Sequence, residues 1–340
     1  MKAVKESKMA KKKEINTEST DRNTKLKNIM QDLNKKFGKG TVKYGKDEPI
    51  KERISFGVEH LDKFTGGGLV RGNFAIAWGG ESCGKSTLAY YTIADAQKKG
   101  LTCAYFDLEH TFNVTRAKKM GIDLDTLVLV EEVNTAEEAM DAMILLCKEK
   151  VIDVAIVDSI QAMSPKGEQE TKTGGGKSVE DDTMALLARK MGQFLRMSKD
   201  YVYQANIAVL LIGQIRTGGI GGFAPRATLT GGNALKHFSM LTLFMRRGQK
   251  AEAPVEKYKE TWIDEKTGKE RYKTQERIIG FDCVLKIEKQ KIDGCRPELS
   301  ELHIPFYAES GFIKEEVSDD SARSEANTDE IQEPAEGQDS

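Results

Sequence analysis

Apolar runs of strand length alternate with longer helical patterns through the middle of the chain. The runs predict buried strands at Gly72–Trp78, Thr102–Asp107, Leu127–Glu131, Asp153–Asp158, Ile207–Gly213 and Met240–Met245. Helices with one apolar side are predicted between them, at Lys85–Lys99, Thr135–Lys150 and about Thr183–Gln204. Strands that alternate with helices in this way indicate βαβ units and a mostly parallel central sheet. The predicted fold class is therefore α/β.

The pattern changes after Arg247. Polar alternation over Glu260–Gln275, around Lys266-Thr267-Gly268, predicts an exposed hairpin. Strands at Phe281–Ile287 and Glu301–Phe306 then close the folded part. Three stretches are too rich in glycine for regular structure and are predicted as loops that a ligand would order: Thr65–Gly68, Thr173–Lys177 and Thr217–Gly222.

The N-terminal segment contains one amphipathic pattern. Lys25–Phe37 has apolar residues at helical spacing, so we predict a helix with one apolar side. That side packs either on the chain's own domain or on a neighbouring subunit, and the pattern alone favours neither. The predicted organisation is a basic N-terminal segment at 1–47 that contains this helix as a candidate oligomerisation helix, a core at 48–313 and a tail at 314–340.

Charge is distributed unevenly along the 340 residues, although 52 Lys and Arg nearly balance 53 Asp and Glu. Residues 1–46 carry 14 Lys or Arg against 5 Asp or Glu, whereas residues 315–340 carry 10 Asp or Glu and one Arg. With few large apolar residues to bury, the tail is predicted to be a disordered acidic extension. The alternative is a polyanion mimic that competes for a basic nucleic-acid groove.

Other classes of protein are excluded by composition. No apolar run approaches the roughly 18 residues of a membrane span, and the basic N-terminus lacks the apolar stretch of a signal peptide. We therefore expect a cytoplasmic protein without a membrane partner. Its five cysteines nowhere form C-x-x-C, so neither a disulfide framework nor a zinc site is indicated.

The strongest chemical signal is a phosphate-binding loop. The motif G-x-x-x-x-G-K-S lies between a predicted strand and a predicted helix, and we expect its residues to bind nucleotide: Gly79, Gly80, Glu81, Ser82, Cys83, Gly84, Lys85, Ser86 and the adjoining Thr87. Backbone N–H groups and the helix dipole would hold the phosphates. Lys85 should reach the β- and γ-phosphates, and Ser86 should bind Mg²⁺.

Two carboxylates end neighbouring predicted strands. Asp158 is placed to orient the water bound to Mg²⁺, although many strands end in Asp because it caps a turn. Glu109 ends the segment AYFDLE and could polarise water for attack on the γ-phosphate. The alternatives for Glu109 are a solvated side chain or a pair with His110.

Gln214 lies at a third strand tip and begins a flexible loop. A polar side chain there can bind the terminal phosphate and link nucleotide state to loop order. The segment that follows mixes cations with an aromatic residue among glycines, which suits single-stranded nucleic acid: Arg216, Phe223, Arg226 and Lys236. An ordinary surface loop is the alternative.

These motifs together resemble the RecA family of DNA strand-exchange recombinases, both bacterial and phage-encoded. The resemblance begins at FGKGTVKYG, runs through GGESCGKST, CAYFDLEH, DVAIVDSIQAMSPKGE and IGQIR, reaches TGGNALK, and ends with KIEKQKI. It implies a RecA-like P-loop ATPase that uses ATP and Mg²⁺. It also implies helical filaments on single-stranded DNA, pairing with homologous duplex DNA, and assistance from single-strand-binding and loader proteins.

The resemblance assigns roles to particular residues. Lys85, Ser86 and Asp158 match nucleotide and metal contacts, Glu109 the catalytic glutamate, and Gln214 the γ-phosphate sensor. Lys289 and Lys291 match a pair that reaches into the ATP site of the adjacent subunit. Matches to DNA contacts are Arg189 and Arg196, after a first loop at about Glu168–Asp181, Phe223 within a second loop at Thr217–Leu229, and Gly231, Gly232 and Asn233.

The sequence departs from the family at several positions. Asn113 stands where an acidic residue contacts adenine, Arg116 replaces the aromatic residue that stacks on the base, and His237 takes a usually aromatic position. The acidic tail follows Ile313 almost directly, where bacterial members carry a further helical domain. Two rival functions are a ring-forming motor of the replicative helicase kind and a non-catalytic filament or mediator protein.

Overall fold

The computed structural model describes residues 21–166, 179–218, 226–249, 253–263, 270–291, 294–295 and 300–313. The chain divides into two units, Met1–Lys51 and Glu52–Ser340. In the first unit, residues 21–37 are helical, which confirms the predicted helix and begins it earlier. Leu26, Ile29 and Phe37 on this helix are exposed. The 3₁₀ turn η1 (Gly45–Asp47) follows. The predicted tail from residue 314 lies outside the described residues.

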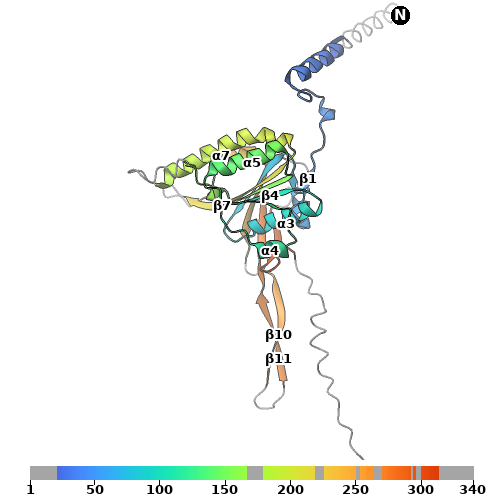
Figure 1. Cartoon of the computed structure of the whole chain (residues 1–340). Helices are drawn as coiled ribbons and strands as arrows, with labels where there is room; N and C mark the ends of the chain where they lie inside the picture. The colour runs from blue at the N-terminus through green and yellow to red at the C-terminus, as the bar shows by residue number, and fades with distance from the viewer. Residues whose placement is uncertain are drawn as a thin grey trace, which may run out of the picture. The chain divides into compact units, whose positions relative to one another are not determined.

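A nine-stranded sheet organises the second unit (Figure 1). Eight of its strands run in the order β13 (Leu302–Tyr307), β12 (Gly280–Gln290), β9 (Ser239–Arg247), β3 (Asn73–Gly79), β7 (Ala208–Gly218), β6 (Val154–Asp158), β4 (Cys103–Asp107) and β5 (Val128–Val130), and the ninth, β8 (Arg226–Leu229), pairs with β7 off this path. The strands from β9 to β5 are parallel, and β12 and β13 add an antiparallel edge. The predicted α/β class and mostly parallel sheet are confirmed.

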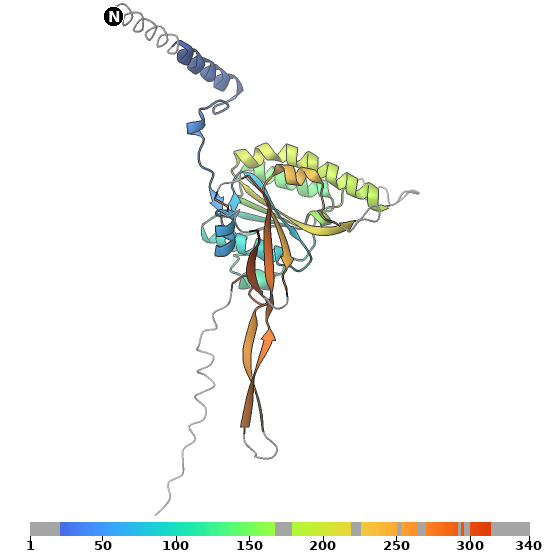
Figure 2. The same cartoon turned by 180° about the vertical axis from the view of Figure 1, so that it is seen from behind.

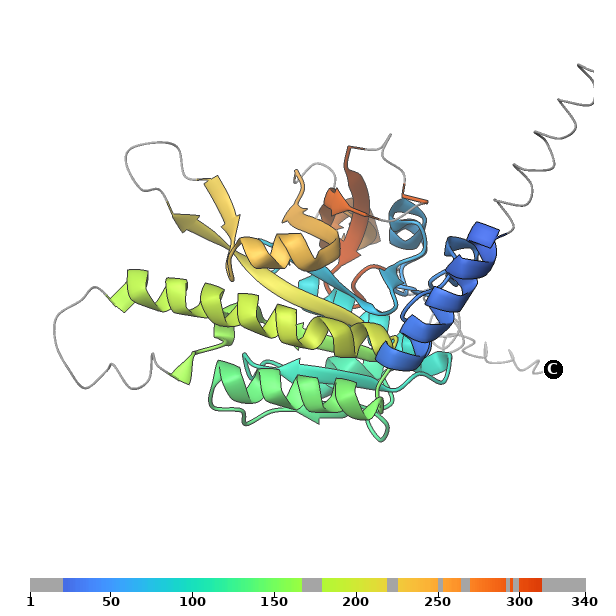
Figure 3. The same ribbon diagram turned by 90° about the horizontal axis from the view of Figure 1, so that it is seen from above.

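Helices cover both faces of this sheet. One face carries α3 (Lys85–Lys98), and the other carries α5 (Ala136–Glu149) and α7 (Val179–Gln204) (Figure 3). Alternation along β3 explains the two cores, because Ala75 and Ala77 pack with α3 whereas Phe74, Ile76 and Trp78 pack on the opposite face. Strands buried on both sides read as continuous apolar runs, which is why their sequence pattern was clear.

Several short elements complete the fold and had no periodic signal in the sequence. They are β1 (Arg53–Ile54), α2 (Glu59–Thr65), β2 (Leu69–Val70), α4 (Val114–Lys119), η2 (Ile160–Ala162), β8 (Arg226–Leu229) and α8 (Asn233–Phe238). In the part of the chain that the structure describes, no helix is long and apolar enough to span a bilayer. The five cysteines are free thiols in the structure, and four of them are buried.

The predicted hairpin is confirmed and is longer than expected. β10 (Val255–Ile263) and β11 (Glu270–Ile278) pair along their whole lengths as a separate two-stranded sheet (Figure 2). Every residue of β10 is exposed, including Tyr258 and Trp262. The Arg277 guanidinium lies 6.0 Å from the Tyr258 ring, and an ion pair joins Arg277 to Glu256.

One glycine-rich segment is more regular than predicted. We expected Thr217–Gly222 to lack regular structure, but β7 continues to Gly218. The reason is a partner strand, because β8 pairs antiparallel with this end of β7, from Ile215 opposite Leu229 to Gly218 opposite Arg226. These ladder hydrogen bonds outweigh the weak strand preference of glycine.

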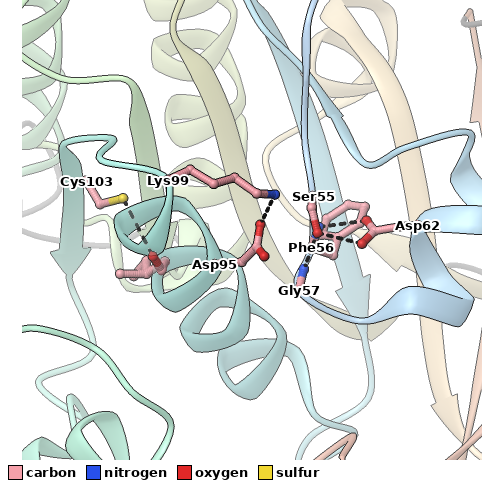
Figure 4. A network of polar contacts seen from close by, with 8 residues as sticks. Ser55, Phe56, Gly57, Asp62, Asp95, Lys99 and Cys103 are labelled. Atoms are coloured by element: carbon pink, nitrogen blue, oxygen red, sulfur yellow. Dashed lines mark hydrogen bonds and ion pairs between the residues drawn. The ribbon is translucent and has the colours of Figure 1, made fainter.

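A polar network ties the start of the second unit together (Figure 4). The Asp62 carboxylate on α2 accepts hydrogen bonds from Ser55 Oγ at 2.6 Å and from the Phe56 N–H at 2.7 Å. The Gly57 N–H donates in turn to Ser55 Oγ at 2.8 Å. Burial raises the pKa of Asp62, while the two hydrogen bonds to its carboxylate lower it. This carboxylate therefore fixes the turn that enters α2.

Replacing Asp62 with Ala should lower the free energy of unfolding by about 2 to 3 kcal/mol, because two partly buried donors lose a charged acceptor. Asp95→Ala is the matched control, since it removes the neighbouring ion pair with Lys99 on the α3 surface. That pair should contribute only about 0.3 to 0.5 kcal/mol. Urea denaturation of both variants measures the difference, and equal losses would contradict the assigned role of Asp62.

Candidate nucleotide and nucleic-acid sites

The glycine-rich loop joins the carboxyl end of β3 to the start of α3. A Cβ on Gly79 would lie 1.9 Å from the Met245 carbonyl oxygen of β9, so only glycine allows this approach. Gly84 has φ +98°, and a Cβ there would meet the Phe306 ring at 2.9 Å. At Gly80 a Cβ would meet nothing within 4 Å. The loop is therefore tightly packed at both ends and open at its second glycine.

Lys85 points back into this loop. Its side chain is buried at 7% exposure, and Nζ donates to the carbonyl oxygens of Gly79, at 3.3 Å, and Gly80. Nζ also lies 3.8 Å from Cys83 Sγ. Burial raises the pKa of Cys83, so this thiol is poorly reactive. Glu81 and Ser82 on the loop are exposed.

The two predicted metal ligands are neighbours. Ser86 hydrogen-bonds to the Asp158 carboxylate, and Tyr105 Oη donates to Asp158 Oδ2 at 2.7 Å. Asp158 is 3% exposed, and burial raises its pKa while the bonds from Ser86 and Tyr105 lower it. No cluster of three metal-binding side chains occurs among the described residues, which is compatible with Mg²⁺ held by one or two protein ligands and by phosphate oxygens.

Glu109 and Gln214 contact each other, although they are far apart in the sequence. Gln214 Nε2 donates to Glu109 Oε1 at 2.8 Å, and Ser159 Oγ donates to the same oxygen. Gln161 Nε2 donates to the Gln214 carbonyl at 2.8 Å. Among the described residues, Ser159 and Gln214 contact the Glu109 carboxylate, and His110 does not. A carboxylate next to the phosphate loop is thus joined to the strand that leads toward β8.

A cleft of about 630 Å³ opens beside the loop. Its walls come from the loop, α4 and the antiparallel edge of the sheet, and include Ser86, Thr87, Arg116, Arg247, Phe281 and Phe306. Arg116 Nη2 donates to Thr87 Oγ1 at 3.2 Å, and the buried Arg116 Nε has no hydrogen-bond partner among the described residues. Such an unpaired donor fits a ligand that carries acceptor oxygens or nitrogens.

Asn113 is placed differently from Arg116. It is the N-cap of α4, and its Oδ1 accepts the Arg116 N–H at 2.8 Å. Its own N–H donates to Tyr90 Oη at 2.9 Å. Asn113 is exposed and is not one of the residues that line the cleft. Its predicted contact with the base stays a prediction.

Lys289 of β12 lies opposite Thr242 of β9, which lies opposite Ile76 of β3, three residues before Gly79 of the phosphate loop. Its Nζ donates to the carbonyl oxygens of Lys236 and His237, the latter at 3.1 Å, which precede the first residue of β9. β3 and β9 are parallel, with Phe74 opposite Ser239 and Gly79 opposite Met245, and their register shifts between Phe74 and Ala75. Five residue steps along the strands separate these ends by roughly 16 Å. The carbonyl oxygens that accept from the Lys289 ammonium therefore lie toward the end of β3 and β9 that is away from the phosphate loop.

Exposed arginines and a glycine turn gather at α7 and α8. Arg189 and Arg196 are seven residues apart on α7, so they share one side of the helix, and both are exposed. A Cβ on Gly232 would lie 2.9 Å from Ala188 Cβ, and one on Gly192 would lie 3.6 Å from Ala234 Cβ. The turn Gly231-Gly232-Asn233 thus begins α8 directly against the arginine-bearing helix (Figure 3).

The remaining predicted DNA contacts belong to β7, β8 and the two predicted loops. Arg216 and Arg226 lie on the paired ends of β7 and β8. Phe223 and most of the predicted first loop lie outside the described residues.

A phosphate loop between a buried strand and a helix, with carboxylates at the neighbouring strand tips, defines a P-loop nucleotide-binding protein of the α/β class. The open Gly80, the buried Lys85 and the Ser86–Asp158 pair fit a nucleoside triphosphate with Mg²⁺.

The model of the RecA N-terminal domain matches residues 24–291, so the chain belongs to the RecA family. Protein RecA of Rhizobium leguminosarum bv. trifolii (strain WSM2304) is 38% identical over 237 residues, which cover 68% of this chain and 64% of the relative. Protein RecA of Sulfurovum sp. (strain NBC37-1) is 40% identical over 223 residues, which cover 64% of this chain and 62% of the relative. The chain thus matches less than two thirds of the length of these relatives.

Sequence reasoning missed several residues that support the site. Ser159 donates a hydrogen bond to Glu109, and Tyr105 donates one to Asp158. Gln161 donates to the backbone carbonyl of Gln214. Arg247 lies over the Phe281 ring at 4.5 Å and donates to the Ser82 carbonyl at 3.0 Å. Of these residues, only Ser159 could have been found from the sequence, because it directly follows Asp158 at a strand tip.

Proposed function

We propose that the chain is an ATP-dependent recombinase that forms helical filaments on single-stranded DNA and catalyses homologous pairing and strand exchange. ATP hydrolysis stimulated by DNA accompanies this reaction. The observation that carries the proposal is the 2.8 Å contact between Gln214 and Glu109. It joins a carboxylate beside the phosphate loop to the strand that leads into the predicted DNA loop, so the nucleotide and DNA sites can influence each other.

The chain's own residues divide the work of hydrolysis. Lys85 and the loop amides hold the β- and γ-phosphates, while Ser86 and Asp158 hold Mg²⁺. When bound, Mg²⁺ would supply charge that offsets the charge developing on the transferred phosphoryl group. Glu109 orients and deprotonates the attacking water, and Ser159 and Gln214 fix its carboxylate. Arg116 and the cleft walls receive the ribose and base.

The nucleic acid binds through its backbone in this proposal. Arg189, Arg196 and the N-terminal turn of α8 take phosphates of single-stranded DNA, and Phe223 separates bases. Specificity then comes from base pairing with the homologous duplex, so affinity should fall steeply with salt and depend little on sequence. Single-strand-binding and loader proteins are the expected partners, and the cytoplasm is the expected compartment.

Strand exchange between homologous oligonucleotides tests the proposal. With ATP and Mg²⁺, the protein should exchange strands of matched sequence and should fail with a heterologous duplex or without nucleotide. Electron microscopy with a non-hydrolysable ATP analogue should show open helical filaments on the single strand. Closed rings or hydrolysis without exchange would instead support a motor, and absence of any DNA-stimulated hydrolysis would support a mediator.

A further inference from the structure

One carboxylate oxygen of Glu288 joins two strands of the sheet and the helix α8. Trp78 Nε1 on β3 donates to Glu288 Oε2 on β12 at 2.9 Å. Lys236 Nζ on α8 lies 3.4 Å from the same oxygen and 5.1 Å from the Trp78 ring centroid. The three side chains thus form a closed set of contacts, in which each touches the other two.

The burial of Trp78 makes the Glu288 carboxylate an important hydrogen-bond acceptor. Trp78 is 2% exposed, and a buried indole N–H needs an acceptor. Phe244 packs against the ring with centroids 4.9 Å apart, so the indole is held in place. The Glu288 and Lys236 side chains are 28% and 46% exposed, which lets their ion pair form at the surface edge of this buried ring.

A β-bulge explains why Glu288 points toward β3. The register between β12 and β9 shifts between Ile287 and Lys289, so Glu288 is the extra residue on β12. A bulge re-aims the side chain that it inserts and changes the direction of the strand. The next residue, Lys289, then reaches the carbonyl oxygens of Lys236 and His237. The same bulge therefore orients the side chains of both Glu288 and Lys289 toward α8.

Trp78 connects this set to the nucleotide site, because the next residue along β3 is Gly79 of the phosphate loop. On the proposed function, Lys289 serves the nucleotide of an adjoining subunit. We infer that Glu288 is a positioning residue, which anchors Trp78 and Lys236 and thereby holds Lys289 ready for the neighbouring site. This inference rests on the proposed function and extends it to the link between two successive nucleotide sites.

Glu288→Gln is the main test, because glutamine keeps an oxygen for the indole N–H and removes the charge that pairs with Lys236. The variant should bind a fluorescent ATP analogue within about twofold of wild type, and its KM for ATP should be unchanged. Its DNA-stimulated kcat should fall roughly tenfold, as expected when a transition-state cation is misplaced. Glu288→Ala should lose at least as much. Glu301→Ala is the matched control, because it removes an ion pair of similar exposure with Arg246 from the same sheet.

Fluorescence gives a second readout, because the chain has only two tryptophans. In a Trp262→Phe background, Trp78 is the sole indole, and its emission should change when ATP analogue and single-stranded DNA bind together. Glu288→Gln should remove that change. Wild-type turnover in Glu288→Gln, or the same loss in Glu301→Ala, overturns the inference while the proposed function stands. A wild-type protein without DNA-stimulated hydrolysis overturns both.

Discussion

Glu109→Gln should produce filaments that assemble on single-stranded DNA with ATP and no longer hydrolyse it. Glutamine can still accept the hydrogen bond from Ser159, so the strand tip should keep its structure. It cannot take a proton from water, and loss of a general base costs about 10² to 10⁴ in rate. DNA-stimulated phosphate release should therefore fall by at least about a hundredfold, while sedimentation or electron microscopy still detects ATP-dependent filaments.

Lys85→Ala supplies the contrast for this experiment. It removes the ammonium group that lies on the loop carbonyls, so it should weaken nucleotide binding as well as hydrolysis. Filaments that need ATP should then be lost together with turnover. If Glu109→Gln also dissolves the filaments, its carboxylate supports the structure rather than the chemistry. If Lys85→Ala retains full hydrolysis, the nucleotide site has been assigned wrongly.

The sequence predicted the parallel sheet well because strands covered on both faces are apolar at successive positions. It predicted the phosphate loop from its glycine spacing, and close packing requires the glycines at the two ends of the loop, as in the approach of Gly79 to the Met245 carbonyl. Short helices such as α4 and α8 were not predicted, because six residues show less than two turns of helical periodicity.

Contacts between distant residues were harder to predict. Glu109 and Gln214 were each recognised at a strand tip, but their 2.8 Å contact depends on the order of the strands in the sheet. Glu288 gave no signal, since its contact with Trp78 spans 210 residues and depends on a bulge. The pairing of β7 with β8 was also missed, because glycine content suggested a loop where a partner strand supplies hydrogen bonds.

If Lys289 serves the nucleotide of a neighbouring subunit, its replacement should impair hydrolysis and leave nucleotide binding to its own chain intact. Lys289→Ala alone should reduce DNA-stimulated hydrolysis by about a thousandfold, as loss of a cation supplied in trans does elsewhere. Lys291→Ala should act in the same direction. Neither variant should impair nucleotide binding to the isolated chain, because the Lys289 ammonium is bonded to carbonyl oxygens that precede β9, away from its own phosphate loop.

An equal mixture of Lys289→Ala and Glu109→Gln subunits should recover activity that neither variant has alone. A site is active when its own subunit keeps Glu109 and its neighbour keeps Lys289. In a randomly mixed head-to-tail filament, roughly a quarter of the sites meet both conditions. Turnover in the mixture should therefore approach about a quarter of the wild-type rate, measured as phosphate release on saturating single-stranded DNA.

The control mixture combines Glu109→Gln with Asp158→Asn. Both changes damage the site of the subunit that carries them, and every subunit keeps its lysine pair. No arrangement of neighbours then creates an intact site, so the mixture should stay inactive. If the mixture with Lys289→Ala is equally inactive although filaments form, the lysines act within their own subunit or not at all. Recovery in that mixture alone would establish that each nucleotide is shared between two chains, because an active site then combines Glu109 of one subunit with Lys289 of its neighbour.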